Sequence, residues 1–139
     1  MSLENLVKIG QLEQITPDAH DINRLLEAAK RSLNDAQLSG LSAEGRFDMA
    51  YKAIMQSANA ALQASGFRTL TSKPGHHQAM IQTLPQTVGL DKDTTIQLDA
   101  LRKQRNVIDY SGDIVSDTMA NEAVQHAKEL IARVQDELI

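Results

Sequence analysis

The chain has 139 residues, which is the length of one ordinary domain, no cysteine, and a formal net charge of −4. Disulfides and cysteine-ligated zinc are therefore excluded, and the acidic balance argues against non-specific binding to nucleic acid, because such binding needs a basic surface that releases counterions from phosphates. No apolar run approaches the ~20 residues that cross a bilayer, so we expect a soluble, cytoplasmic protein that makes no membrane contact.

The first half of the chain predicts an arm and two long helices. Residues 1–17 are weakly amphipathic and are predicted as an N-terminal arm or a short helix. From residue 18 to about residue 38, apolar residues recur three and four positions apart, which places them on one face of a helix. Ser42 offers an N-cap to a second long helix, and Gly66 is the natural end of that helix.

The second half predicts a polar connection, a short helix and two more long helices. Residues 67–75 have the composition of an irregular connection, and a short helix is predicted from residue 76 to about residue 84. A third long helix runs from about residue 93 to residue 110, and the last one begins after Ser116. The apolar side of the third long helix is predicted to contain Ile96, Leu98, Leu101 and Ile108.

These elements place the chain in the all-α class. It contains two Phe, two Tyr and no Trp, so the core is predicted to consist of small and aliphatic side chains between closely packed helices. Four long amphipathic helices with short links favour an up-and-down bundle with one or two further short helices, forming a single domain over residues 18–139.

One segment, residues 101–112, has the composition of a functional site. Arginine holds phosphate with a planar fork of donors, and Asn, Asp and Tyr supply further donors and acceptors around it. The candidate ligand-binding residues of this segment are Arg102, Arg105, Asn106, Asp109 and Tyr110. A purely structural interpretation is also open, because Arg105 and Asp109 are four positions apart and can pair on one helix face, and because cations near a helix C-terminus oppose the macrodipole.

The order of elements and this segment together resemble the HEPN family (higher eukaryotes and prokaryotes nucleotide-binding domains), which are bundles of four to five helices with a polar motif late in the chain. That motif is an Arg, usually followed by Asn or another polar residue, and then a His after four to six intervening residues. Arg105-Asn106 matches its start, and Gly66-Phe67 after the second long helix is also similar to the family. The resemblance covers most of residues 18–138.

The chain departs from the family motif at the histidine. After four intervening residues, Tyr110 stands where the family's ribonucleases carry His. The resemblance implies that those enzymes cleave RNA without a metal, with the His assisting proton transfer and the Arg stabilising the phosphate charge. An unperturbed Tyr titrates near pH ~10 and exchanges protons poorly at pH 7. We therefore expect a variant without ribonuclease activity, although the enzyme question stays open.

Two neighbouring histidines, His76 and His77, add a second candidate group at the start of the predicted short helix. If this segment meets the end of the third long helix, one His would supply the missing acid or base. Two groups would then surround a phosphate, namely Arg68, Lys73, His76 and His77 from this segment and Arg102, Arg105, Asn106 and Tyr110 from the helix. In the alternative interpretation both histidines are exposed loop and cap residues. No metal site is predicted, because neighbouring helix residues point about 100 degrees apart and no third ligand is visible.

Three functions follow from these observations. The first is a non-catalytic module that binds a nucleotide, an RNA or a partner protein in a cleft around Arg105. The second is a metal-independent ribonuclease toxin of a toxin-antitoxin or defence system, with Arg105, Tyr110 and His77 as candidate catalytic residues. The third is a structural helical adaptor. The resemblance implies a homodimer and a nucleotidyltransferase-like partner protein, and we predict no cofactor.

A map of the surface separates these functions. A concave polar cleft that contains Arg105, Asn106 and Tyr110 favours the first two functions. Pairing of Arg105 with Asp109 on a convex face favours the third.

Overall fold

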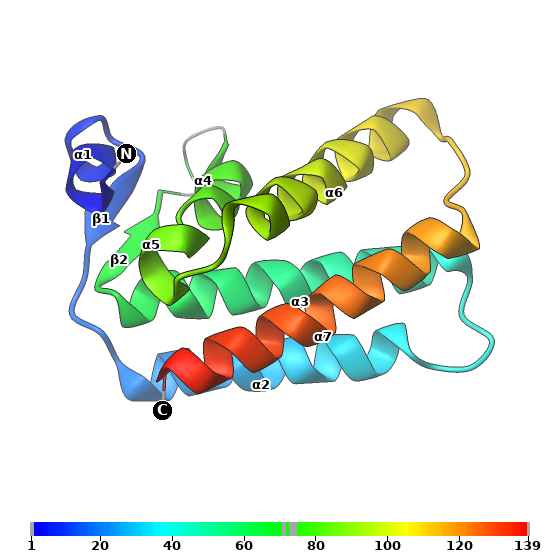
Figure 1. Cartoon of the computed structure of the whole chain (residues 1–139), viewed down its shortest axis with the longest axis horizontal. Coiled ribbons are helices and arrows are strands. Elements are labelled where there is room, and N and C mark those ends of the chain that lie inside the picture. Colours follow the sequence, from blue (N-terminus) through cyan, green and yellow to red (C-terminus); the bar gives the residue numbers. More distant parts are fainter. Residues whose placement is uncertain (1, 71, 73–74, 139) are drawn as a thin grey trace.

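Helices make up most of the structure, a computed structural model that describes residues 2–70, 72 and 75–138. The elements in chain order are α1 (Leu3–Lys8), β1 (Leu12–Gln14), α2 (Ala19–Ala36), α3 (Ala43–Ala64), β2 (Phe67–Thr69), α4 (His76–Gln82), α5 (Leu84–Val88), α6 (Lys92–Ser111) and α7 (Asp117–Leu138). The predicted all-α class with four long helices is confirmed. Three of those helices, α2, α3 and α7, lie side by side (Figure 1).

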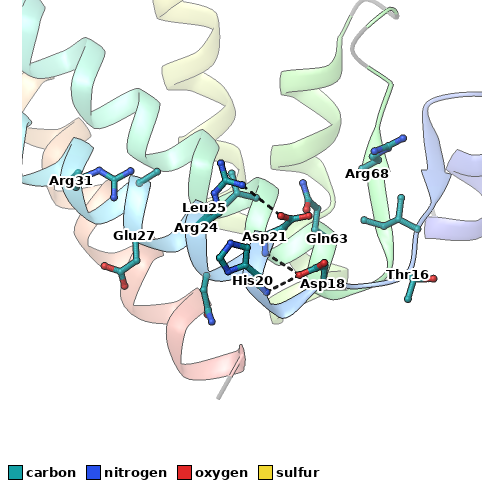
Figure 2. A pocket seen from close by; sticks show the side chains of 13 residues that line it. Thr16, Asp18, His20, Asp21, Arg24, Leu25, Glu27, Arg31, Gln63 and Arg68 are labelled. Atoms are coloured by element: carbon teal, nitrogen blue, oxygen red, sulfur yellow. Dashed lines mark hydrogen bonds and ion pairs between the residues drawn. The ribbon is translucent and has the colours of Figure 1, made fainter.

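Helix ends are set by residues that can cap them. Asp18 Oδ1 accepts a hydrogen bond of 2.8 Å from the backbone N–H of His20 at the start of α2 (Figure 2). Ser42 Oγ accepts a hydrogen bond of 3.0 Å from the backbone N–H of Gly45, which confirms the predicted cap of α3. Gly66 follows the end of α3 with a φ of 91°, a conformation that favours glycine.

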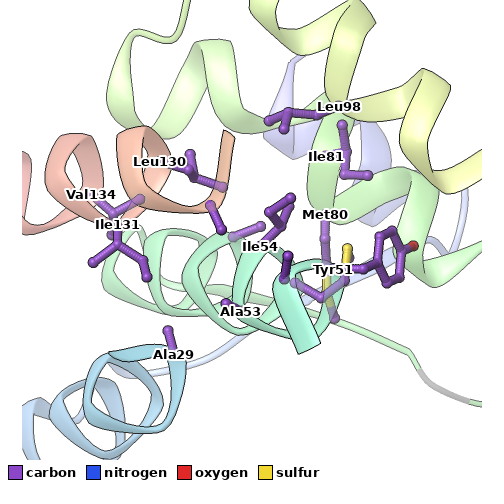
Figure 3. Close-up of a cluster of buried hydrophobic side chains, with 14 of the residues drawn as sticks. Ala29, Tyr51, Ala53, Ile54, Met80, Ile81, Leu98, Leu130, Ile131 and Val134 are labelled. Atoms are coloured by element: carbon purple, nitrogen blue, oxygen red, sulfur yellow. The ribbon is translucent and has the colours of Figure 1, made fainter. Parts of the chain in front are cut away.

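The core is built of small and aliphatic side chains, as the composition predicts. α3 packs against both α2 and α7, and its alanines at positions 50, 53 and 60 are fully buried. Small side chains allow neighbouring helices to approach closely, and larger ones fill the space between the layers. Figure 3 shows larger members of the same cluster, which include Ile54 of α3, Ile81 of α4, Leu98 of α6, and Leu130 and Val134 of α7.

α6 joins the body of the fold through α4 and α5 and diverges from α3 towards its C-terminal end (Figure 1). Its buried side is formed by Thr95, Leu98 and Leu101. The prediction that Ile96 lies on this side is wrong, because Ile96 is 58% exposed. Ile96 follows Thr95 directly, and adjacent helix residues point about 100 degrees apart.

A two-stranded sheet fastens the N-terminal arm to the rest of the chain. β1 and β2 pair antiparallel, with Leu12 opposite Thr69 and Gln14 opposite Phe67. Leu12 is buried in the main core cluster. The prediction of an irregular connection over residues 67–75 is therefore wrong for its first three residues, which form β2. A strand of three residues is too short to show a clear alternation of apolar and polar residues in the sequence.

Candidate functional site

A cavity of about 490 Å³ opens between α3, α4 and α6. α4 contributes His76 and His77 to its lining, and α6 contributes Arg105. The start of α4 therefore shares this cavity with Arg105 of α6, whereas the last residues of α6 are not among the lining residues. The remaining lining residues are Asp48, Met49, Tyr51, Lys52, Met55, Gln56 and Asn59 of α3, and Met80 of α4.

Arg105 lies over an aromatic ring at the edge of this cavity. Its Cζ is 4.9 Å from the centroid of the Tyr51 ring, a distance at which a cation is attracted to the ring face. Its Nε lies 3.9 Å from Oδ1 of Asp48 in a long ion pair. That Nε is buried, and it has no hydrogen-bond partner among the described residues. The guanidinium is thus held mainly by the Tyr51 ring, and its Nε–H remains available to donate a hydrogen bond to a ligand.

Tyr51 also positions His77. The Tyr51 hydroxyl oxygen lies 3.2 Å from Nδ1 of His77, and the two ring centroids are 5.9 Å apart. Burial raises the pKa of Tyr51 to about 12, so its hydroxyl keeps its proton at neutral pH. A hydroxyl that donates to Nδ1 leaves the proton of a neutral imidazole on Nε2. Tyr51 therefore connects Arg105 and His77, which come from different helices.

The structure separates the predicted site residues into two groups. Arg105, His76 and His77 line the cavity, whereas the other candidates that the structure describes are not among its lining residues. Arg102 Nε donates to Asp99 Oδ1 at 2.8 Å, so this guanidinium is engaged on its own helix. The other candidates of α6 are all exposed, namely Asn106, Asp109 and Tyr110.

Arg68 and Lys73 are the remaining predicted cations. Arg68 is paired with Glu13 across the β1–β2 sheet. Lys73 lies outside the described residues, so its predicted place beside the histidines stays a prediction. The structural alternative for Arg105 also differs from its prediction, because Arg105 pairs with Asp48 and no pair with Asp109 is found within residues 2–70, 72 and 75–138.

Comparison with known proteins decides the family. The HEPN domain model matches residues 22–137, which is well over half of the chain. The chain belongs to the HEPN family. This membership relates the chain to nucleotide- and RNA-associated functions and agrees with its all-α fold. No curated protein and no solved structure gives a significant match.

In this HEPN domain the motif position of the family's histidine is occupied by a solvent-exposed tyrosine. Tyr110 is 94% exposed and lines a separate surface depression together with Asn106, Val107 and Ser111. Five residues on a helix correspond to a rotation of about 140 degrees beyond a full turn, so Tyr110 and Arg105 face different directions. A concave polar cleft is present, as the first two functions require, but it contains Arg105 without Asn106 or Tyr110.

The polar residues of α3 in this cavity are not predicted by the motif. Asp48, Lys52, Gln56 and Asn59 recur at spacings of three and four and so follow one face of α3. Tyr51 lies on the same helix and is only 3% exposed. The available signal was a polar stripe on an otherwise alanine-rich helix.

A larger groove of about 810 Å³ lies beside the start of α2 (Figure 2). It contains three arginines, Arg24, Arg31 and Arg68. Arg24 has an acidic partner in Asp21 at 3.9 Å, and Arg68 has one in Glu13. Asp18 and Glu27 also line this groove, so it holds both positive and negative side chains. We consider the cavity around Arg105, with its buried Nε that has no hydrogen-bond partner among the described residues, the better candidate site.

Two features are absent from the described part of the chain. No helix there combines the length and the apolar character that a bilayer crossing requires. No three His, Asp or Glu side chains gather there in a way that would hold a metal ion.

His77, in the cavity between α3, α4 and α6, should make the stability of the protein depend on pH. Burial lowers the pKa of His77 below its ordinary value of 6.5, and the positive charges of His76, Arg105 and Arg102 act in the same direction. The unfolded chain therefore binds more protons than the folded chain as the pH falls below 6.5, so the free energy of unfolding is expected to decrease there.

Urea denaturation at about pH 8 and about pH 5.5 measures this effect. The loss of stability at the lower pH should be smaller in His77→Gln than in the wild type. Identical losses in both proteins would contradict the assignment to His77.

Proposed function

We propose that this HEPN domain binds a nucleoside phosphate, either free or as part of an RNA, in the cavity between α3, α4 and α6 and does not cleave it. The observation that carries the proposal is the guanidinium of Arg105, which stacks on Tyr51 and keeps a buried Nε without a hydrogen-bond partner among the described residues. A buried donor without a partner costs about 1–3 kcal/mol, which a phosphate oxygen in the cavity would offset.

The rest of the cavity suits the same ligand. Lys52 adds a second positive charge to the lining, and three methionines, at positions 49, 55 and 80, add apolar surface. Methionine adapts its shape and packs well against aromatic rings. A volume of about 490 Å³ also lies within the usual range of small-molecule sites, about 300–1,000 Å³.

The absence of cleavage is proposed from the position of Tyr110. General acid–base catalysis needs a group that exchanges protons near the working pH and that reaches the reacting atoms. Tyr110 occupies the motif position of the family's histidine, is 94% exposed, and is not among the lining residues of the cavity.

Titration calorimetry with nucleoside monophosphates and a short single-stranded RNA tests the proposal. The wild type should show saturable binding with a Kd of about 1 mM or tighter. Lack of saturation for every ligand would contradict the proposal and favour the structural adaptor.

A second candidate function, the metal-independent ribonuclease, is favoured by one observation. His77 shares the cavity with Arg105 and is oriented by the Tyr51 hydroxyl. The test is incubation of the wild type, Arg105→Ala and His77→Gln with a mixed RNA panel in EDTA. Cleavage that requires both residues would replace the binding proposal, whereas intact RNA in all three samples supports it.

We also propose that the exposed end of α6 is the surface on which a second copy docks, since HEPN domains commonly dimerise. Val107 and Tyr110 on α6 and Ile114 in the following loop are exposed, Ile114 to 93%. A nucleotidyltransferase partner stays a prediction.

The substitution Ile114→Asp should weaken self-association at least about 100-fold. Each buried Ile contributes about 1.5–3 kcal/mol, and a twofold interface contains the residue twice. Sedimentation velocity measures the change, and Ile9→Asp, at another exposed Ile, is the matched control. A wild type that stays monomeric, or an equal effect of the control, would contradict the dimer surface.

A further inference from the structure

Two amide side chains of α3, Gln56 and Asn59, line the same cavity as Arg105. Gln56 Oε1 accepts a hydrogen bond of 2.8 Å from the hydroxyl of the buried Ser32. Asn59 Oδ1 accepts one of 3.2 Å from the side-chain amide of Gln63. Each side-chain oxygen therefore already accepts a hydrogen bond from the protein, which turns the oxygen towards Ser32 or Gln63. The two NH₂ groups donate to no protein group among the described residues, so they remain for a ligand.

This orientation of the amides has a consequence for base recognition. An amide with both its oxygen and its NH₂ group free pairs with adenine, which presents an acceptor at N7 next to a donor at N6. Two amides that offer only NH₂ groups match an edge with two adjacent acceptors, and guanine presents such an edge at N7 and O6. The N6 amino group of adenine would face a second donor and leave both unpaired.

The positions of these groups along α3 fit a mononucleotide. Tyr51 and Asn59 are eight residues apart, which is a rise of about 12 Å along the helix. The Arg105 guanidinium lies over the Tyr51 ring. Met55 and Met80 contribute apolar lining to the same cavity. One end of the cavity thus offers cations for a phosphate, and the α3 amides offer donors for a base edge.

We infer that the cavity selects guanosine phosphates over adenosine phosphates, with the phosphate at Arg105 and the guanine N7 and O6 at Gln56 and Asn59. The inference rests on the proposed function and adds to it the identity of the base. Gln56 and Asn59 act here as residues that determine specificity.

The experiment compares GMP, AMP and ribose 5-phosphate by titration calorimetry on the wild type, Gln56→Glu and the control Gln97→Glu. Gln56→Glu keeps the acceptor for Ser32 and replaces the donor by a second acceptor. Gln97 is exposed on α6 and is not a lining residue, so its variant carries the same charge change outside the cavity. Ribose 5-phosphate reports the effect of the added charge on phosphate binding alone.

The wild type and Gln97→Glu should bind GMP roughly tenfold more tightly than AMP, and Gln56→Glu should abolish or reverse this preference. Equal binding of GMP and AMP by the wild type, with ribose 5-phosphate also bound, would overturn the inference and leave the proposed function in place. Failure of all three ligands would overturn both.

The same comparison with 5′-phosphorylated trinucleotides that begin with G or A identifies the source of the ligand. Tighter binding of the trinucleotide than of GMP points to an RNA end, and the reverse order points to a free nucleotide. The preference for G over A is expected in both cases, and its absence in both would overturn the inference.

Discussion

Replacement of Arg105 by Gln is expected to weaken nucleoside phosphate binding about 10- to 100-fold and to leave the fold intact. Charge-assisted hydrogen bonds to a phosphate contribute about 1.5–3 kcal/mol, and each 1.4 kcal/mol corresponds to about a tenfold change in Kd. The Arg105 side chain is 35% exposed and has one long ion pair, to Asp48. Its loss should therefore change the free energy of unfolding by less than about 1 kcal/mol.

Titration calorimetry with GMP and thermal unfolding measure the two effects separately. Arg102→Gln is the matched control, because it removes the same charge from the same helix at a guanidinium that is already bonded to Asp99. Arg105→Lys should bind with intermediate affinity, since lysine keeps the charge and loses the planar fork. An Arg102→Gln variant that binds as weakly as Arg105→Gln would show that only the general charge of α6 matters.

Replacement of Tyr51 by Ala is expected to have the largest effect on stability, a loss of about 3–5 kcal/mol. The Tyr51 ring is 3% exposed and belongs to the main core cluster, so its removal leaves a cavity as large as an aromatic side chain. The same change removes the ring below Arg105 and the hydroxyl beside His77. Urea denaturation measures the loss of stability.

Tyr51→Phe separates the packing of the ring from the hydrogen bond. The phenylalanine ring keeps the core filled and keeps the surface below Arg105, so only the bond to His77 Nδ1 is lost. We expect a loss of stability of about 1 kcal/mol and little change in GMP affinity. A loss as large as that of Tyr51→Ala would contradict the account in which the ring supplies most of the stabilisation.

Much of the fold could be predicted from sequence because its signals are local. The apolar spacing of α2 and α7, the cap at Ser42 and the left-handed glycine at position 66 each depend on a few neighbouring residues. The sheet could not be predicted in this way. Its two strands have three residues each and lie far apart in the chain, so their pairing depends on how the arm docks.

The candidate site was only partly predictable for a similar reason. Arg105 stands out because of its motif, but the groups that surround it come from α3 and α4 and are brought to it by tertiary packing. A short motif also does not reveal towards which side of the helix each of its side chains points. Tyr110 is close to Arg105 in sequence and faces solvent, whereas His77 is distant in sequence and lines the same cavity.

An NMR titration with GMP tests whether the cavity around Arg105 is the phosphate site. It follows the Nε–Hε signal of Arg105 and the imidazole signals of His77. Because Arg105 Nε is buried and has no hydrogen-bond partner among the described residues, a phosphate at this site should shift the Arg105 signal downfield, with accompanying shifts at His77 and Gln56. Saturable shifts confined to these residues are the predicted result. Unchanged signals of Arg105 and His77 at saturating GMP would contradict the assignment of the cavity as the binding site.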